Sequence, residues 1–306
     1  MPSRRRVVEY LVVLVAAIVT AAVLLVADRA GQQAAQPDTP PTSSPTTGSV
    51  VTSTGTSTPT TTVEPGPTGT SVTTVPTAPS TTTTGRPTTA PPAVPPALAG
   101  RDHERLPTTR KVVALTFDAG ANADGVAPIL ATLRREGVPA TFFLTGAFAQ
   151  RFAGQSASIA AAGHRLGNHS VSHPHFPSLS DQAIRTELAG AEEAIRASTG
   201  RTSRPLFRFP FGDRDQRTIR TVNDAGYVPV RWTVDSLGWK GTSGGMTADS
   251  VTARVLNALQ PGEIVLMHVG SNPDDHSTLD ADALPSTIAR IRAAGYGFVT
   301  LDALLT

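Results

Sequence analysis

The sequence predicts an α/β domain in the C-terminal two-thirds of the chain, with parallel strands covered by helices. From residue 111 onward, short apolar segments alternate with segments whose apolar residues recur at helical spacing. About seven strand–helix pairs follow one another in roughly 200 residues, and strands joined by helical crossovers pair in parallel. Such strands close into a barrel or stay open as a sheet, and in both forms the chemistry belongs at their C-terminal ends.

The apolar segments predict strands in chain order. They lie at residues 112–117, 140–144, 206–209, 227–232, 263–267 and 297–301. Helical patterns are found at residues 126–136, 180–200, 214–225, 247–259 and 281–294. The helix within residues 180–200 has the clearest ends, because Ser180 is a preferred N-cap and Gly200 tolerates the left-handed turn that ends a helix.

The N-terminal segment, residues 1–30, predicts a membrane anchor. Three arginines precede an apolar run at residues 11–27 that is interrupted only by Thr20. At about 1.5 Å per residue, a helix of this length crosses most of a hydrocarbon layer of about 30 Å. Asp28 and Arg29 follow directly in place of a small-residue cleavage pattern, which favours an uncleaved transmembrane helix over a removed signal peptide. The arginine cluster should stay cytoplasmic, and the rest of the chain should be exported.

Residues 31–105 predict a disordered linker. The stretch consists mostly of Thr, Pro, Ser, Gly, Ala and Val, with few charges, and cannot bury enough apolar surface to offset its ordering entropy. The chain has no cysteine, which fits an exported domain that is stable without disulfides. We therefore expect a membrane-anchored protein with an extracytoplasmic folded domain at residues 106–306, or a secreted protein if the leader is removed.

The charge balance argues against nucleic acid as a partner. The chain has 26 Lys and Arg residues against 24 Asp and Glu residues. A nearly neutral folded region lacks the basic surface that a phosphate backbone requires. A zinc peptidase is also disfavoured, because the chain contains no His-Glu-x-x-His motif.

Side chains suited to chemistry stand at or just after the ends of predicted strands. They are Asp118, Arg208, Asp235, Trp239 and His268. A further pair, His169 and His173, has the four-residue spacing of many metal-ligand pairs. A carboxylate, two paired imidazoles and a separate imidazole form the inventory of a mononuclear metal site that hydrolyses a carbonyl compound. Each residue also has a structural reading, as a turn cap, a surface side chain or a core aromatic.

Five segments resemble a known set of motifs in both order and content. They are residues 116–120 (TFDAG), 169–173 (HSVSH), 208–212 (RFPFG), 235–239 (DSLGW) and 266–268 (LMH). Together they resemble the motifs of the polysaccharide deacetylases, also called the NodB-homology or carbohydrate esterase family 4 domain. The resemblance runs from about residue 111 to residue 305 and implies a distorted (β/α)7 barrel.

The resemblance implies a metal centre with an adjacent base. His169 and His173 would bind a divalent ion, which is usually zinc in this family, with Co²⁺ or another divalent ion as alternatives. Asp118 would be the general base that takes a proton from the attacking water, and Arg208 would hold and orient Asp118.

The resemblance also implies how the acetyl group and the leaving group are handled. The backbone N–H of Phe211 would help to stabilise the oxyanion, and His268 would protonate the departing amine. Trp239 and Leu266 would shape the acetyl pocket.

Position 119 departs from the family pattern. The family usually carries a second aspartate there that completes three metal ligands, whereas this chain carries Ala119. Two histidines alone should bind a metal less tightly, unless Asp118, Asn122, Asp124 or water supplies the third ligand.

Position 238 departs from the pattern as well. An aspartate normally precedes the tryptophan of the fourth motif and tunes the general acid, whereas this chain has Gly238. Asp235, three residues earlier, is a candidate for that tuning role.

The sequence therefore predicts a metal-dependent hydrolase that removes N-acetyl or O-acetyl groups from a cell-wall or extracellular polysaccharide, with peptidoglycan as the expected substrate. It should act as a monomer that is held at the membrane by its N-terminal helix. The alternative is a catalytically degenerate domain that is tethered to the membrane and binds glycan without turning it over.

Overall fold

The computed structural model describes residues 93–306, so the predicted anchor and most of the predicted linker lie outside the described residues. At the centre of the fold is strand β1 (Val112–Ala119), which is buried along its whole length. It pairs in parallel with β2 (Thr141–Leu144) on one side and with β7 (Glu263–His268) on the other.

Further strands extend this sheet in both directions. β3 (Arg165–Asn168), β4 (Leu206–Phe207) and β5 (Val228–Pro229) continue beyond β2, and β6 (Val234–Asp235) pairs with the far side of β7. β8 (Gly297–Phe298) joins the start of β1. The strand order is β5-β4-β3-β2-β1-β7-β6, and every pairing is parallel.

The sheet is an open half-barrel, one of the two forms that the sequence allows, and it is consistent with the distorted (β/α)7 barrel that the family resemblance implies. β5 and β6 are the two ends of the strand order, and no ladder joins them in residues 93–306. An extended segment lies across this opening, because His103 pairs with Val230 and Arg105 pairs with Glu263 through isolated bridges. The parallel order with helical crossovers is that of the predicted α/β class.

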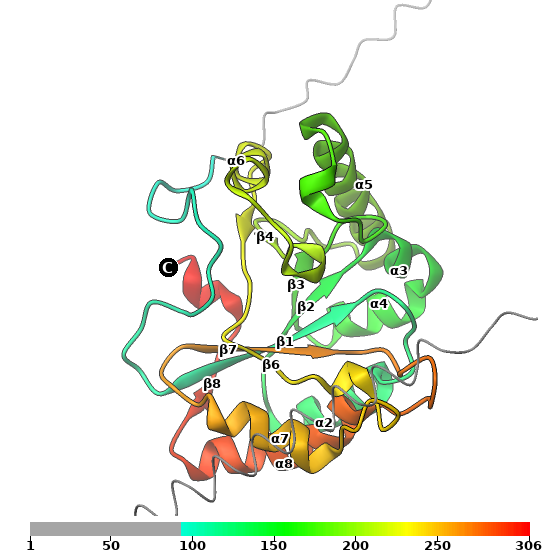
Figure 1. Cartoon of the computed structure of the whole chain (residues 1–306), viewed down its shortest axis with the longest axis vertical. Helices are drawn as coiled ribbons and strands as arrows, with labels where there is room; N and C mark the ends of the chain where they lie inside the picture. Colours follow the sequence, from blue (N-terminus) through cyan, green and yellow to red (C-terminus); the bar gives the residue numbers. More distant parts are fainter. Residues whose placement is uncertain (1–92) are drawn as a thin grey trace, which may run out of the picture. The chain divides into compact units, whose positions relative to one another are not determined.

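Helices cover the outer face of the sheet. In chain order they are α2 (Val126–Glu136), α3 (Gly146–Arg151), α4 (Ala153–Ala161), α5 (Asp181–Thr199), α6 (Gln216–Asp224), α7 (Ala248–Asn257) and α8 (Leu279–Ala293). Short 3-10 turns lie at Phe176–Ser178 (η1), Pro210–Gly212 (η2), Gly238–Lys240 (η3) and Leu301–Leu304 (η4). Figure 1 shows α2, α7 and α8 grouped along β1 and β7, with α3, α4 and α5 on the side of β2 and β3.

The two faces of β1 have different surroundings, because successive side chains of a strand point in opposite directions. The odd-numbered residues from Val113 to Ala119 belong to the larger apolar cluster, which also contains buried residues of α2, α4, α7 and α8. Ala114 belongs to a second cluster inside the half-barrel. Thr116 and Asp118 follow Ala114 at intervals of two, so Asp118 is directed to the interior and Ala119 to the helix layer.

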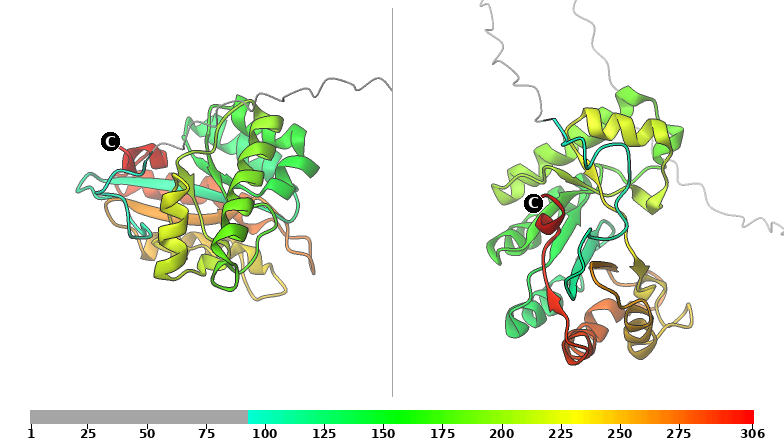
Figure 2. Two further views of the ribbon diagram at one scale, coloured as in Figure 1. Left: turned by 90° about the horizontal axis from the view of Figure 1, so that it is seen from above. Right: turned by 90° about the vertical axis from the view of Figure 1, so that its left-hand side faces the viewer.

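Residues from both ends of the domain close the inner cluster. Leu106 from the N-terminal segment and Leu301 and Leu304 from η4 are buried in it. The views of Figure 2 place the red C-terminal turn close to the cyan N-terminal segment. Val94 and Leu98 also pack against this cluster. The last part of the predicted linker, from residue 93, therefore lies against the domain.

The structure confirms the long periodic elements and adds short ones that the sequence did not predict. α5 begins after Ser180, whose side chain accepts the N–H of Ala183, and ends at Gly200 with φ of 69°. β3, α3, α4 and β6 were not predicted. β3 contains a single apolar residue and includes Gly167, where a Cβ atom would run into the ring of Phe143. Within residues 93–306 the helices are too short or too polar to cross a membrane.

Candidate active site

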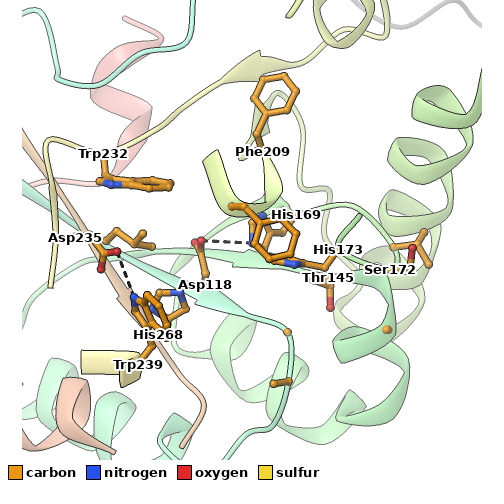
Figure 3. Close-up of a pocket in the computed structure, with 16 residues that line it drawn as sticks. Asp118, Thr145, His169, Ser172, His173, Phe209, Trp232, Asp235, Trp239 and His268 are labelled. Carbon is orange, nitrogen blue, oxygen red and sulfur yellow. Dashed lines mark hydrogen bonds and ion pairs between the residues drawn. The ribbon is translucent and has the colours of Figure 1, made fainter. Parts of the chain in front are cut away.

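A cavity of about 650 Å³ opens at the C-terminal ends of the strands. The predicted site residues that line it are Asp118, His169, His173, Phe211, Asp235, Trp239, Leu266 and His268. Arg208 is fully buried and lies behind Asp118, to which it is bonded. Figure 3 shows Asp118 near the middle, with His169 and His173 on one side and His268 and Trp239 on the other. The fold therefore brings together all nine predicted site residues.

Asp118 and His268 are direct neighbours in the strand register. They are Cα partners in the parallel pairing of β1 with β7. Asp118 is directed into the half-barrel by the alternation of β1, and His268 is the last residue of β7. Two groups with different acid–base character thus stand side by side at the edge of the cavity.

Arg208 is held in one orientation by four hydrogen bonds. Its Nη1 donates to Asp118 Oδ1 over 2.7 Å and to Thr116 Oγ1 over 2.9 Å. Its Nε donates to the carbonyl of Val230 over 3.1 Å, and its Nη2 donates to the carbonyl of Arg231 over 2.9 Å. The guanidinium is therefore a fixed charge, and it contacts the carboxylate through its Nη1.

The Arg208 guanidinium keeps Asp118 ionised. Burial alone would raise the pKa of the Asp118 carboxyl, but the charge of Arg208 and a smaller contribution from His268 hold this pKa below its ordinary value. Because Oδ1 is occupied by Arg208, Oδ2 is the oxygen that faces His169, whose Nε2 lies 3.4 Å away. A negatively charged oxygen is thus available beside the histidine pair.

His169 is fixed in the tautomer that suits a metal ligand. Its Nδ1–H donates to the backbone carbonyl of Arg208 over 2.9 Å, so its Nε2 carries the lone pair. Burial lowers the pKa of His169 below its ordinary value, which keeps the imidazole neutral. A neutral imidazole with one nitrogen anchored to the backbone is the usual form of a metal-binding histidine.

His173 is placed by a tight loop that follows β3. The backbone turns through left-handed conformations at Ser170 (φ 66°) and His173 (φ 60°). The Asn168 side chain accepts the N–H of Ser170, and the Ser170 hydroxyl accepts the N–H of His173. The two rings lie 4.8 Å apart between centroids, and burial together with the neighbouring His169 lowers the pKa of His173 to about 4. Both imidazoles are therefore neutral at physiological pH.

A carboxylate from helix α5 holds the same loop from behind. Glu187 Oε2 accepts the backbone N–H groups of Val171 over 2.7 Å and Ser172 over 2.9 Å. Its Oε1 accepts the Ser172 hydroxyl over 2.8 Å. Glu187 therefore stabilises the backbone between the two histidines, a role that the sequence did not reveal.

The donor set of this site suits a divalent transition metal. Two neutral imidazoles lie side by side, and a carboxylate oxygen is adjacent to one of them. Imidazole nitrogen is a favoured ligand of zinc, and carboxylate oxygen is an accepted one. His169 and His173 are the residues that would hold the ion.

No third protein ligand is evident among the described residues. Residues 93–306 contain no group of three or more His, Cys, Asp or Glu side chains arranged to hold a metal ion. Asn122 and Asp124 are both bonded to Ser271, over 2.8 Å and 2.5 Å, and do not line the cavity. Ala119 is fully buried in the outer apolar cluster. Of the candidates for the third ligand, Asp118 and water remain.

His268 is contacted by a carboxylate that the sequence did not predict. The backbone N–H of His268 donates to Asp280 Oδ2 over 2.8 Å, and Asp280 belongs to the first turn of α8. Burial would lower the pKa of His268, but Asp280 and the more distant Asp118 and Asp235 raise it above its ordinary value. His268 therefore tends to carry the proton that a general acid must donate.

Asp235 has a different partner from the one suggested by sequence. Its Oδ2 accepts the indole N–H of Trp239 over 3.2 Å, and its Oδ1 accepts the N–H of Leu237 over 2.8 Å. These bonds fix the orientation of Trp239, which is 45% exposed at the cavity edge with its ring 6.4 Å from that of His268. Asp235 therefore orients the tryptophan wall and acts on His268 only at longer range.

Phe211 forms the opposite wall. It lies in η2 with φ of 60°, and its ring is 58% exposed. The ring stacks on His175 at 4.2 Å and meets the edge of His173 at 4.4 Å. Two exposed aromatic rings, Phe211 and Trp239, thus line the same cavity as Asp118 and the histidines.

Sequence comparisons lead to the same family as the motifs. A family profile described as polysaccharide deacetylase matches residues 105–230. A relative from Bacillus cereus, named peptidoglycan-N-acetylglucosamine deacetylase, is 33% identical over 198 residues, which cover 65% of this chain and 70% of that protein. The chain belongs to the polysaccharide deacetylase family. Its relatives are named as N-deacetylases, which are hydrolases.

A second relative is longer than the region it shares with this chain. The peptidoglycan-N-acetylglucosamine deacetylase PgdA of Listeria monocytogenes is 33% identical over 199 residues. The match covers 64% of this chain and 39% of the Listeria protein. The shared region is thus one part of that larger protein.

A solved structure shows that the family includes inactive members. A mutant of a Bacillus anthracis protein has a TM-score of 0.62 and 30% identity, and the match covers 68% of this chain and 72% of that chain. It is described as a pseudoenzyme of carbohydrate esterase family 4 with restored enzymatic activity. Membership of the family therefore leaves the activity of each chain to be argued from its own site.

Proposed function

We propose that this domain is a metal-dependent hydrolase that removes N-acetyl groups from peptidoglycan. The observation that carries the proposal is the arrangement around Asp118. This carboxylate is kept ionised by the buried Arg208, has one oxygen beside the histidine pair, and stands opposite His268 in the strand register. A domain that only binds glycan has no use for a base and an acid side by side at one cavity.

Hydrolysis of an amide needs an activated water, a polarised carbonyl and a proton for the leaving nitrogen. The Asp118 Oδ2 would accept a proton from water as the water oxygen bonds to the acetyl carbon. His268 would donate its proton to the nitrogen as the carbon–nitrogen bond breaks, which leaves acetate and a free amine on the sugar. A divalent ion held by His169 and His173, zinc or cobalt, would supply Lewis acidity to water and carbonyl.

The walls of the cavity fit an acetylated sugar. Leu266 and Trp239 line it close to His268 and present the apolar surface that an acetyl methyl group needs. The exposed ring of Phe211 lies on the other side and offers a face for a sugar ring. Two relatives named for peptidoglycan support that polymer as the substrate. The same chemistry extends to O-acetyl esters, which have a better leaving group.

A second candidate function, glycan binding without turnover, is favoured by one observation. The described residues provide two histidines and no complete three-ligand group. If the affinity for metal is too low, the aromatic walls would still bind a sugar while the reaction lacks its Lewis acid. A solved structure of this family is described as a pseudoenzyme, so inactive members of the family exist.

Acetate release decides between the two functions. The full-length protein, purified in detergent and supplied with zinc or cobalt, is incubated with peptidoglycan and with N-acetylglucosamine oligomers. The proposal predicts acetate and new primary amines from peptidoglycan, and none from an Asp118→Asn variant. Binding of glycan without acetate at saturating metal would establish the second function instead.

We also propose that the protein acts as a monomer, anchored through residues 1–30 with residues 106–306 outside the cytoplasmic membrane. The apolar run and its arginine flank support this location. Protease added to intact cells should degrade the domain, and the domain should sediment with membranes. Release of the domain into the medium would favour a cleaved leader.

A further inference from the structure

Helix α8 begins next to the end of β7, and its first turn contributes a buried carboxylate. Asp280 is 3% exposed. Its Oδ2 accepts the backbone N–H of His268 over 2.8 Å, and its Oδ1 accepts the hydroxyl of Ser236 over 2.6 Å. Asp280 is thereby fixed between β7 and the loop that leads to Trp239.

The imidazole of His268 is placed to use this carboxylate. Its Nδ1 is buried, has no hydrogen-bond partner among the described residues, and lies 3.8 Å from Asp280 Oδ2. A buried donor without a partner is costly, and Asp280 Oδ2 is the carboxylate oxygen within 4 Å of this nitrogen among the described residues. A bond from Nδ1–H to Asp280 would leave Nε2 as the nitrogen that exchanges a proton in the cavity.

The surroundings of Gly238 show why Asp280 can occupy this position. A Cβ atom added at Gly238 would lie 2.6 Å from the carboxylate carbon of Asp280 and 2.9 Å from its Oδ2. Any side chain at position 238 would therefore compete with the Asp280 carboxylate for the same space. The N–H of Gly238 also donates to the Ser236 hydroxyl that bonds Asp280, so both residues belong to one bonded group.

The other carboxylates near His268 are already engaged. Asp235 bonds to Trp239 and to the N–H of Leu237. Asp118 bonds to Arg208 and faces His169. Asp280 is thus the carboxylate in contact with the His268 residue, whereas Asp118 and Asp235 act on it through space.

We propose that Asp280 is the positioning residue of His268. Asp280 extends from helix α8, and its carboxylate occupies the space that Gly238 leaves free. The carboxylate holds the ring by its Nδ1–H and stabilises the protonated form that donates to the leaving amine. The catalytic consequence rests on the function proposed above, whereas the pairing itself does not.

Four variants of the full-length protein test the proposal. Asp280→Asn keeps the size of the side chain and removes its charge. Asp282→Asn makes the same change two residues along the same helical turn, at an exposed position, and serves as the control. Gly238→Asp combined with Asp280→Gly moves the carboxylate to position 238, and Asp280→Gly alone shows the effect of the vacated space.

The first readout is the pKa of His268, measured from its ring carbon signal by NMR without metal or substrate. We expect Asp280→Asn and Asp280→Gly to lower this pKa by about one unit or more, Asp282→Asn to leave it unchanged, and the double variant to raise it again relative to Asp280→Gly. A His268 pKa that is the same in wild type and Asp280→Asn would overturn the proposal. If Asp280→Asn does not fold, recovery of the pKa in the folded double variant decides the question.

The second readout is the pH profile of acetate release. Asp280→Asn should lower kcat by at least about tenfold, move the alkaline limb of the profile to lower pH, and leave KM nearly unchanged. A loss of kcat with an unmoved alkaline limb would assign Asp280 a purely structural role and contradict the proposal. If the wild type releases no acetate, the hydrolase function fails, and the NMR titration still decides whether Asp280 controls His268.

Discussion

Arg208 and Asp118 form a buried ion pair in which the guanidinium touches one carboxylate oxygen and leaves the other facing His169. The two residues come from β1 and from the end of β4, and neither charge has more than a few per cent of its surface in solvent. A pair of this kind is costly to break, because removal of one partner leaves the other charge buried without compensation. Stability and reactivity of the site therefore depend on the same contact.

Arg208→Lys should damage both stability and reactivity. An ammonium group cannot make the four directed bonds of the guanidinium, so Asp118 would be held less firmly and some buried acceptors would lose their donor. We expect a loss of about 3 kcal/mol in the free energy of unfolding and a fall in kcat of at least about a hundredfold. Urea unfolding and acetate release measure the two effects. A variant that keeps wild-type stability and activity would show that the fork geometry is unimportant.

Asp118→Asn should separate metal binding from turnover. The amide keeps the size of the carboxylate but cannot accept a proton, so kcat should fall by about a thousandfold while the fold and most metal affinity persist. Asp249→Asn, at an exposed position in the first turn of α7, is the matched control. Activity that survives in Asp118→Asn would remove this residue as the base.

His169→Ala should abolish zinc binding and activity together. The change removes the imidazole whose Nδ1 is anchored on Arg208 and leaves His173 as a single ligand. Titration calorimetry with zinc and thermal unfolding with and without a chelator measure the effect, and zinc should raise the unfolding temperature of the wild type only. His276→Asn, at an exposed site, is the control. Equal zinc affinity in wild type and His169→Ala would refute the assigned metal site.

Glu187→Gln should weaken metal binding without touching the metal. Its carboxylate accepts two backbone N–H groups and one hydroxyl from the loop between the two histidines, and an amide replaces one acceptor oxygen with a donor. We expect about a tenfold loss of zinc affinity, as is typical for residues that orient a ligand. Glu193→Gln on the exposed side of the same helix should bind zinc normally. If both variants bind zinc alike, the loop needs no support from α5.

Glu263→Gln should stabilise the domain at alkaline pH. Burial raises the pKa of Glu263 from its ordinary 4.5 to about 7, so the folded state binds the proton more tightly than the unfolded state. The contribution of Glu263 to stability is therefore largest below pH 4.5, falls between pH 4.5 and 7, and stays low above pH 7. Above pH 7 glutamine should remove a cost on the order of 2 kcal/mol, and near pH 4 it should change little. Urea unfolding at both pH values, with Glu193→Gln as the control, measures this; equal gains at both pH values would contradict it.

The regular parts of the fold could be predicted from the sequence because each carries its own signal. α5 has an apolar face of helical spacing between a serine cap and a glycine stop, and β1 is a continuous apolar run. β3 carries no such signal, because it is four residues long and its central Gly167 is set by contact with Phe143 on the neighbouring strand. The sequence also did not decide whether the sheet closes between β5 and β6, because two strands of two residues each carry no local signal for or against this pairing.

The site could be predicted in part from residues at strand ends and from the four-residue spacing of His169 and His173. Asp118, Arg208 and His268 follow apolar runs, and the rule that parallel strands end at one edge brings them together. Glu187 and Asp280 lie in helices, and nothing local distinguishes them from other helical acids. Their roles arise from helix packing against loops that are distant in sequence. Asp235 was expected to tune His268; the structure bonds its side chain to Trp239, and from there it raises the pKa of His268 only through space.

The contact between Gly238 and the Asp280 carboxylate bears on how such chains are classified. A motif scan that scores each position separately counts a missing acid at 238 and moves the chain toward the inactive members of its family. A scan that considers positions 238 and 280 together would find the acid at position 280 and, at position 238, the glycine that leaves room for it. Homologous chains should then carry a bulky acid at one of the two places and a small residue at the other.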